Sequence, residues 1–107
     1  WCSGSGGVPK GTSCYSGKFL VESFFVKVQA HSGHSGRVDI KASGPKNGAC
    51  YGVGFRKSGQ YISLNYAKCG ISGFKFNVLY CSNQDAVSVH VTAPVIGDVM
   101  LSRTSCR

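Results

Sequence analysis

The chain has 107 residues, enough for a single domain (1–107), and its 12 lysines and arginines against four acidic residues give a net charge of +8. A charge this positive favours anionic partners such as nucleic acid, phospholipid headgroups or acidic protein surfaces. The six cysteines show no C-x-x-C spacing, which excludes a zinc ribbon and a thioredoxin-like motif, and no run approaches the roughly 18 apolar residues of a membrane span.

The first 17 residues, WCSGSGGVPKGTSCYSG, are rich in glycine and serine and poor in apolar residues. Such a composition is typical of disorder. Because Cys2 and Cys14 lie within it, we expect the segment to be pinned to the body of the protein as a loop or a short hairpin.

The next segment, Lys18–Ala30, has features of both a helix and a strand. Its apolar residues recur at helical spacing, with polar residues turned outward: Leu20, Val21, Phe24, Phe25 and Val28. Its β-branched and aromatic content favours a strand, which would need a bulge at Ser23 to bring the alternation into phase. The periodicity predicts a helix.

The rest of the chain alternates between apolar and polar residues with a period of two, which indicates strands separated by glycine-rich turns. These strands are expected around residues 38–42, Ala49–Arg56, 62–66, 74–80, 87–91 and Val95–Leu101. Alternation with one polar face predicts an antiparallel sheet that is covered on one side only. The fold expected is therefore α+β, with one helix packed on an antiparallel sheet; the alternative, if 18–30 is a strand, is an all-β sandwich.

The even number of cysteines in a short chain predicts a disulfide framework. We expect all six to be paired: Cys2, Cys14, Cys50, Cys69, Cys81 and Cys106. The chain starts at Trp1 without a charged or apolar leader, so we expect any signal peptide to have been removed. The expected product is a secreted, extracellular monomer without a metal or another cofactor.

Residues for catalysis are sparse, whereas residues for binding are plentiful. There is no G-x-S-x-G elbow, no P-loop and no dinucleotide fingerprint, and four acids make a glycosidase pair improbable. His31 and His34, in the loop HSGHSG, are expected to be solvated. Aromatic rings interleaved with cations are typical of surfaces that bind single-stranded nucleic acid. The residues expected to line such a surface are Tyr51, Arg56, Lys57, Tyr61, Lys75 and His90.

Three stretches resemble the small guanyl-specific fungal ribonucleases: TSCYSGKFLVESFFVKVQAHSG, ACYGVGFRKSGQY and AVSVHVTA. The resemblance implies one helix on an antiparallel sheet and a disulfide that ties the amino-terminal segment to the carboxy terminus, joining Cys106 to Cys2 or Cys14. It also aligns His90 with the family's late catalytic histidine and Lys75 with its arginine, and it leaves His31 or His34 to stand for the early histidine.

One departure from this family affects the expected activity. Gly52 occupies the position of the catalytic glutamate, and without a base to accept the 2′-hydroxyl proton efficient RNA cleavage is not expected. A basic ribonuclease-like protein without its base is similar to the ribonuclease-like effectors secreted by plant-pathogenic fungi. The expected function is thus a non-catalytic effector or virulence protein that acts outside the cell or after delivery into host cells and binds an anionic host partner such as RNA or a protein. The alternatives are a killer toxin or antimicrobial protein acting on anionic cell surfaces, and an active ribonuclease that uses His31 or His34 as base.

Overall fold

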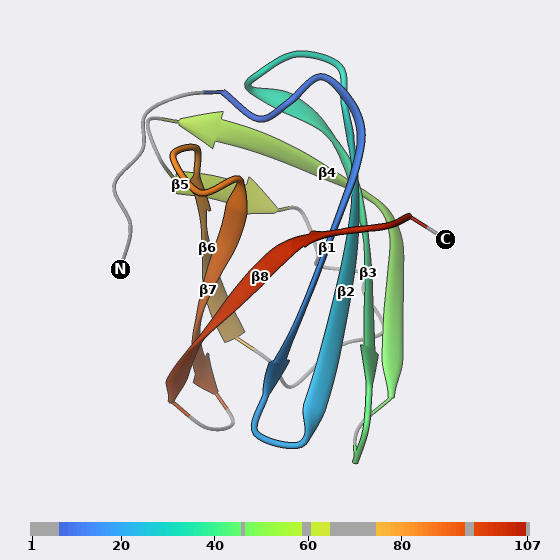
Figure 1. The fold of residues 1–107 in the computed structure, drawn as a ribbon, viewed down its shortest axis with the longest axis vertical. Coiled ribbons are helices and arrows are strands. Elements are labelled where there is room, and N and C mark those ends of the chain that lie inside the picture. The colour runs from blue at the N-terminus through green and yellow to red at the C-terminus, as the bar shows by residue number, and fades with distance from the viewer. Residues whose placement is uncertain (1–6, 46, 59–60, 65–74, 94–95, 107) are drawn as a thin grey trace.

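The computed structural model describes residues 7–45, 47–58, 61–64, 75–93 and 96–106. These residues form eight antiparallel strands that follow one another in chain order around a closed barrel (Figure 1). The strands are β1 (Gly11–Phe19), β2 (Glu22–Ala30), β3 (Ser35–Ser43), β4 (Gly48–Ser58), β5 (Tyr61–Leu64), β6 (Lys75–Cys81), β7 (Ala86–Ala93) and β8 (Gly97–Thr104). The predicted α+β fold is wrong: the described part of the chain contains no helix, and no segment of it qualifies as a membrane-spanning helix. The all-β alternative was closer, although the sheet closes on itself instead of forming a sandwich.

The predicted helix at 18–30 is a β-hairpin. Phe19 pairs with Glu22 across a two-residue turn formed by Leu20 and Val21, and the strands on either side pair along their whole length. The turn explains the change of phase that appeared to require a bulge at Ser23. It also explains the false helical stripe, because two of the five apolar residues in that stripe belong to the exposed turn. The glycine- and serine-rich segment before it is likewise a strand, β1, from Gly11 onward.

The alternating residues of the strands face the interior of the barrel, where they form one apolar core. This core is continuous around the barrel and includes Val8, Tyr15, Val28, Val38, Ile40, Val53, Phe55, Tyr80, Val87, Val99 and Leu101. Its centre is an apolar cavity of about 70 Å³. Eight strands give a barrel that side chains nearly fill, so the small volume agrees with the strand number. Closure also explains the one-sided patterning, because the covered face of the sheet is the inside of the barrel.

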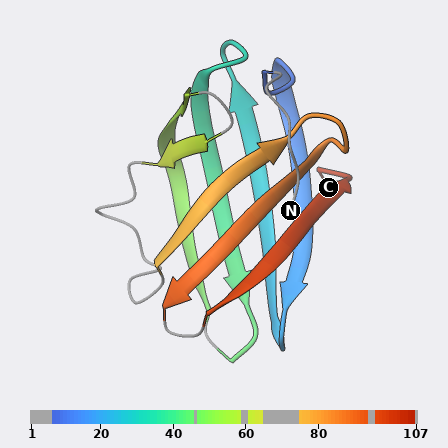
Figure 2. The ribbon, with the colours of Figure 1, turned by 90° about the vertical axis from the view of Figure 1, so that its left-hand side faces the viewer.

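The barrel has two walls that differ in strand direction. In Figure 2, β6, β7 and β8 run obliquely across the long strands β1 to β4, which lie behind them. The short strand β5 connects the walls by pairing with β4 and with β6. The strands β1 to β4 form the first wall and the strands β6 to β8 form the second wall. The outer surfaces of the two walls face different directions, so polar side chains on one wall lie apart from those on the other.

A bulge in β4 bends the first wall. Val38 pairs with Val53 and Ile40 pairs with Cys50, so Tyr51 and Gly52 together lie opposite Asp39. Gly52 has a φ of 67°, in the left-handed region that glycine adopts at little cost, and its N–H donates a 2.8 Å hydrogen bond to Oδ1 of Asp39. Gly52 is thus suited to the left-handed backbone of the bulge.

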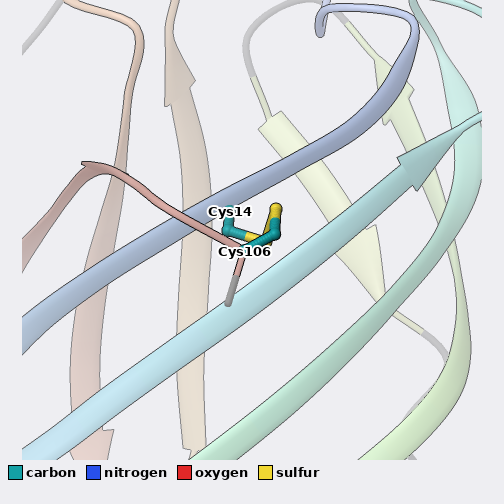
Figure 3. The surroundings of a disulfide bond; sticks show 2 residues. All are labelled: Cys14 and Cys106. Carbon is teal, nitrogen blue, oxygen red and sulfur yellow. A yellow bond between two sulfur atoms is a disulfide. The ribbon is translucent and has the colours of Figure 1, made fainter.

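A disulfide lies beside the short pairing of β1 with β8 that closes the barrel. Only three residue pairs join these strands, and Cys14 is the first residue of β1 among them. Cys14 is bonded to Cys106, which follows β8, so the closing strands are also linked covalently (Figure 3). The expected bond between Cys106 and the amino-terminal segment is therefore present. No cysteine in the described residues is free, and Cys50 and Cys81 are also in disulfides; Cys2 and Cys69 lie outside those residues.

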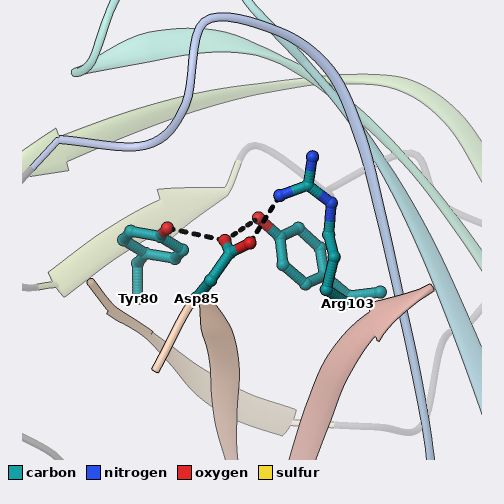
Figure 4. Close-up of polar contacts among 4 residues, drawn as sticks. Tyr80, Asp85 and Arg103 are labelled. Carbon is teal, nitrogen blue, oxygen red and sulfur yellow. Dashed lines mark hydrogen bonds and ion pairs between the residues drawn. The ribbon is translucent and has the colours of Figure 1, made fainter. Parts of the chain in front are cut away.

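A polar cluster inside the same end of the barrel is centred on Asp85. The hydroxyls of Tyr15 and Tyr80 both donate to its Oδ1, at 2.9 and 2.8 Å, and Arg103 forms an ion pair with its other oxygen (Figure 4). Burial and then the bond to Asp85 raise the pKa of Tyr15 to about 12, and the same causes raise the pKa of Tyr80. Burial alone would raise the pKa of Asp85, but the three donors together outweigh it and lower that pKa. The side chains of this cluster link β1, β6 and β8 and so contribute to the stability of the barrel.

Candidate functional site

The six residues predicted to form one binding surface are divided among different parts of the barrel. Tyr51 and Arg56 lie on the outside of β4, where Tyr51 is 72% exposed. Lys57 is only 4% exposed, and its backbone N–H donates a hydrogen bond to the backbone carbonyl of His34. Because Lys57 alternates with Arg56 along β4, the two neighbouring cations point to opposite sides of the sheet.

The other three predicted residues belong to the second wall. Tyr61 begins β5 and is 56% exposed, and His90 lies on the outside of β7. Lys75 is the first residue of β6, and its side chain lies outside the described part of the structure. The structure therefore buries Lys57 and divides the other predicted residues between two walls.

The outside of β1 to β4 carries a cluster of cations that we call the basic wall. Strand register places its five members on one face of the sheet: Lys18, Lys27, Arg37, Lys41 and Arg56. Among the described residues, the only acid on this face is Asp39, which lies opposite Lys27 and accepts the N–H of Gly52. The basic wall therefore accounts for much of the positive charge of the chain.

Two aromatic rings accompany these cations. Phe25 lies directly opposite Lys41 in the β2–β3 pair and is half-buried, and Tyr51 projects from the bulge of β4. Neighbouring strands are about 4.8 Å apart, so Phe25 on β2 and Tyr51 on β4 lie on either side of the cations of β3. Cations for phosphates and rings for bases are the two components of a surface that binds single-stranded nucleic acid.

The second wall is hollowed by a groove of about 560 Å³ on its outer surface, which we call the His90 groove. Its outward-facing residues are Tyr61, Asn77, Leu79, Ser88, His90, Asp98 and Met100. Nδ1 of His90 lies 2.6 Å from Oδ1 of Asp98, its direct cross-strand neighbour. When Nδ1–H donates a hydrogen bond to Oδ1 of Asp98, Nε2 is the ring nitrogen left to contact a ligand.

The basic wall and the Asp98 partner of His90 were not predicted from the sequence. The signal for Asp98 was available: if 87–91 and 97–101 are paired as a hairpin, His90 and Asp98 fall opposite each other. The basic wall required the register of four strands, including the one mistaken for a helix. Lys27 was assigned to the outer face of that helix and was thereby separated from Arg37 and Lys41.

The described residues contain no cluster of three or more histidine, cysteine or acidic side chains that could hold a metal ion. His31 and His34 are both exposed, and the N–H of His34 is bonded to Oγ of Ser32 within their own loop.

Comparison with known proteins adds no relative: no protein-family model matches the sequence, and neither the curated proteins nor the solved structures gave a significant match.

Proposed function

We propose that this protein binds single-stranded RNA through the basic wall without cleaving it. The observation that carries the proposal is the concentration of five cations on the outer face of β1 to β4 against one acid, Asp39. Phosphate contacts from lysine and arginine supply most of the affinity for nucleic acid irrespective of its sequence. Phe25 and Tyr51 provide rings on which bases stack.

Absence of turnover is part of the proposal and is supported by the contacts of Asp39, the acid on the described part of the basic wall. Its Oδ1 accepts a 2.8 Å hydrogen bond from the N–H of Gly52, and its backbone lies opposite Lys27. A general base must reach the proton that it accepts, and this carboxylate is already bonded to the backbone of β4. The proposal does not rest on a ribonuclease fold, because the structure is a closed barrel. It rests on the positive charge of the basic wall and on its two aromatic rings. We retain secretion and the role of an effector as parts of the proposal, and the Cys14–Cys106 disulfide supports secretion because disulfides persist in oxidising compartments.

The binding surface is revised accordingly. Arg56 and Tyr51 remain in it, and Lys18, Lys27, Arg37, Lys41 and Phe25 join them. Lys57 leaves the surface because it is buried, and Tyr61 and His90 belong to the other wall.

The test is fluorescence anisotropy of a labelled single-stranded RNA at low salt. Removing two wall charges in the double variant Arg37→Ala/Lys41→Ala should weaken binding about tenfold or more, since each phosphate contact contributes of the order of 1 kcal/mol. Lys10→Ala is the matched control, because Lys10 is exposed and precedes β1. Equal affinities for the double variant and the wild type would refute the assignment of the wall, and shortening of the RNA by the wild type would refute absence of turnover.

A further inference from the structure

Three large aliphatic side chains are exposed at the turns of the barrel. Leu20 and Val21, which form the β1–β2 turn, are 72% and 73% exposed, and Ile96, which precedes β8, is 75% exposed. Single exposed apolar residues are ordinary, but neighbouring ones indicate an interaction surface.

These three residues lie at the same end of the barrel, which we call the apolar end. The ring of Phe19 packs so closely on Gly97 that a Cβ added there would lie 2.3 Å from it, which brings Ile96 beside the β1–β2 turn. Figures 1 and 2 both show the β1–β2 turn and the start of β8 at the same end of the molecule. The apolar end therefore consists of the β1–β2 turn and of Ile96, which precedes β8.

Leu20 has a backbone conformation that is unfavourable for a leucine. Its φ is 59°, a conformation in which glycine or asparagine is usual and a leucine is strained. The exposed side chain regains little of that cost through packing. Strained backbone conformations are typical of functional positions. A strained and exposed leucine at the tip of the hairpin therefore indicates a function for this side chain.

The exposed charges next to the β1–β2 turn are basic, whereas the acid Asp98 lies two residues after Ile96 and contacts His90. Lys18 is exposed and lies two residues before Leu20, on the outer face of the strand that leads into the turn. Lys41 lies two residues before the end of β3, and the pairing of Ser23 with Ser43 places that end of β3 beside the start of β2. Glu22, the acid next to the turn, is buried.

We infer that the apolar end docks onto an anionic phospholipid surface. Leu20, Val21 and Ile96 enter the boundary between headgroups and acyl chains, and Lys18 and Lys41 contact the headgroups. Protruding aliphatic tips backed by lysines suit a soft, negatively charged layer, which takes up apolar side chains without a shaped pocket. This inference does not rest on RNA binding, which uses the whole outer face of β1 to β4.

Sedimentation with vesicles tests the inference. The wild type should bind vesicles of phosphatidylcholine with 30% phosphatidylserine about tenfold or more tightly than vesicles of phosphatidylcholine alone. Leu20→Gly should weaken binding to the anionic vesicles about tenfold, since an inserted leucine is removed. The same variant should unfold at an equal or higher temperature, because glycine relieves the strained φ. Loss of binding without loss of stability separates a docking residue from a structural one.

Two further variants complete the design. Met100→Ser removes a 37% exposed apolar residue of the His90 groove and should leave vesicle binding unchanged. Arg56 pairs with Ser35, at the end of β3 opposite the apolar end. Arg56→Ala should therefore weaken RNA binding but leave vesicle binding within about twofold, so the two proposals can be contradicted independently. The inference would be overturned if Leu20→Gly bound the anionic vesicles as tightly as the wild type does, or if the wild type bound both vesicle types equally.

Discussion

The hydroxyl of Tyr15, in the first strand of the barrel, donates a 2.9 Å hydrogen bond to the carboxylate of Asp85, 70 residues further along the chain. Asp85 has a φ of 46° in the turn between β6 and β7, and the same carboxylate receives the hydroxyl of Tyr80 and the guanidinium of Arg103. One acidic residue thus links the first and last strands of the barrel at the edge where few backbone pairs join them.

This arrangement predicts a loss of stability in acid. The donors hold the pKa of folded Asp85 below its usual value of 3.8, so its contribution is complete above about pH 4 and is lost as the pH falls through the lowered pKa. Asp85→Asn should be less stable than the wild type at pH 6, and the difference should shrink below pH 4. Urea unfolding across this range measures it. A constant difference between the two proteins would contradict the assignment.

The closing disulfide should contribute a large part of the stability. Cys14 and Cys106 are 92 residues apart, and in the chain-entropy description a loop of that length stabilises the fold by about 4–5 kcal/mol. The double variant Cys14→Ala/Cys106→Ala should therefore lose about that much free energy of unfolding. A loss below about 1 kcal/mol would show that the bond does not constrain the unfolded chain.

The β2 strand predicts an alternating response to alanine. Phe24 and Val26 line the interior cavity, whereas Phe25 faces outward. Phe24→Ala should cost about 3 kcal/mol and Val26→Ala about 1–2 kcal/mol, while Phe25→Ala should cost less than Phe24→Ala. Chemical denaturation of the three variants is the measurement. Equal, large losses at Phe24 and Phe25 with little at Val26 are the pattern of a helix and would contradict the hairpin.

The bulge in β4 predicts opposite effects for two glycines. Gly52 has a φ of 67°, so Gly52→Ala should cost about 1–2 kcal/mol, although a Cβ there would meet no atom within 4 Å. Gly54, two residues later, also has open space and lacks a positive φ, so Gly54→Ala should be neutral or slightly stabilising. If both variants behave alike in thermal unfolding, the left-handed backbone at Gly52 is wrong.

The sequence was informative wherever alternation alone decides the structure. The strands around Val38–Ala42, Val87–Val91 and Phe55 were predicted because inward apolar residues alternate with outward polar ones. The hairpin at Leu20–Val21 was missed because its turn contains two large apolar residues in place of the usual glycine or asparagine. That error made β2 and the end of β1 appear as a helix, and together with the loop expected before Lys18 it made a closed barrel appear as an open sheet.

The candidate surface depended on the same error. Arg56 and Lys57 are adjacent in the sequence, and only the position of β4 in a barrel shows that one is exposed and the other is buried. The basic wall combines cations from four strands, so it could not be assembled until β1 was placed beside β2 and β2 beside β3. The charge composition led to the anionic partner that we propose, whereas strand register was needed to locate the basic wall.

The salt dependence of RNA binding tests the central claim most directly. For single-stranded RNA, the logarithm of the affinity should fall by about 0.7 per logarithmic unit of salt for each phosphate that the basic wall neutralises. We therefore predict a steep slope for the wild type and a slope shallower by about 1.4 for Arg37→Ala/Lys41→Ala, which removes two contacts, with no change for Lys10→Ala. A slope that is unchanged in the double variant, or wild-type binding that does not respond to salt, would contradict binding of RNA by the basic wall.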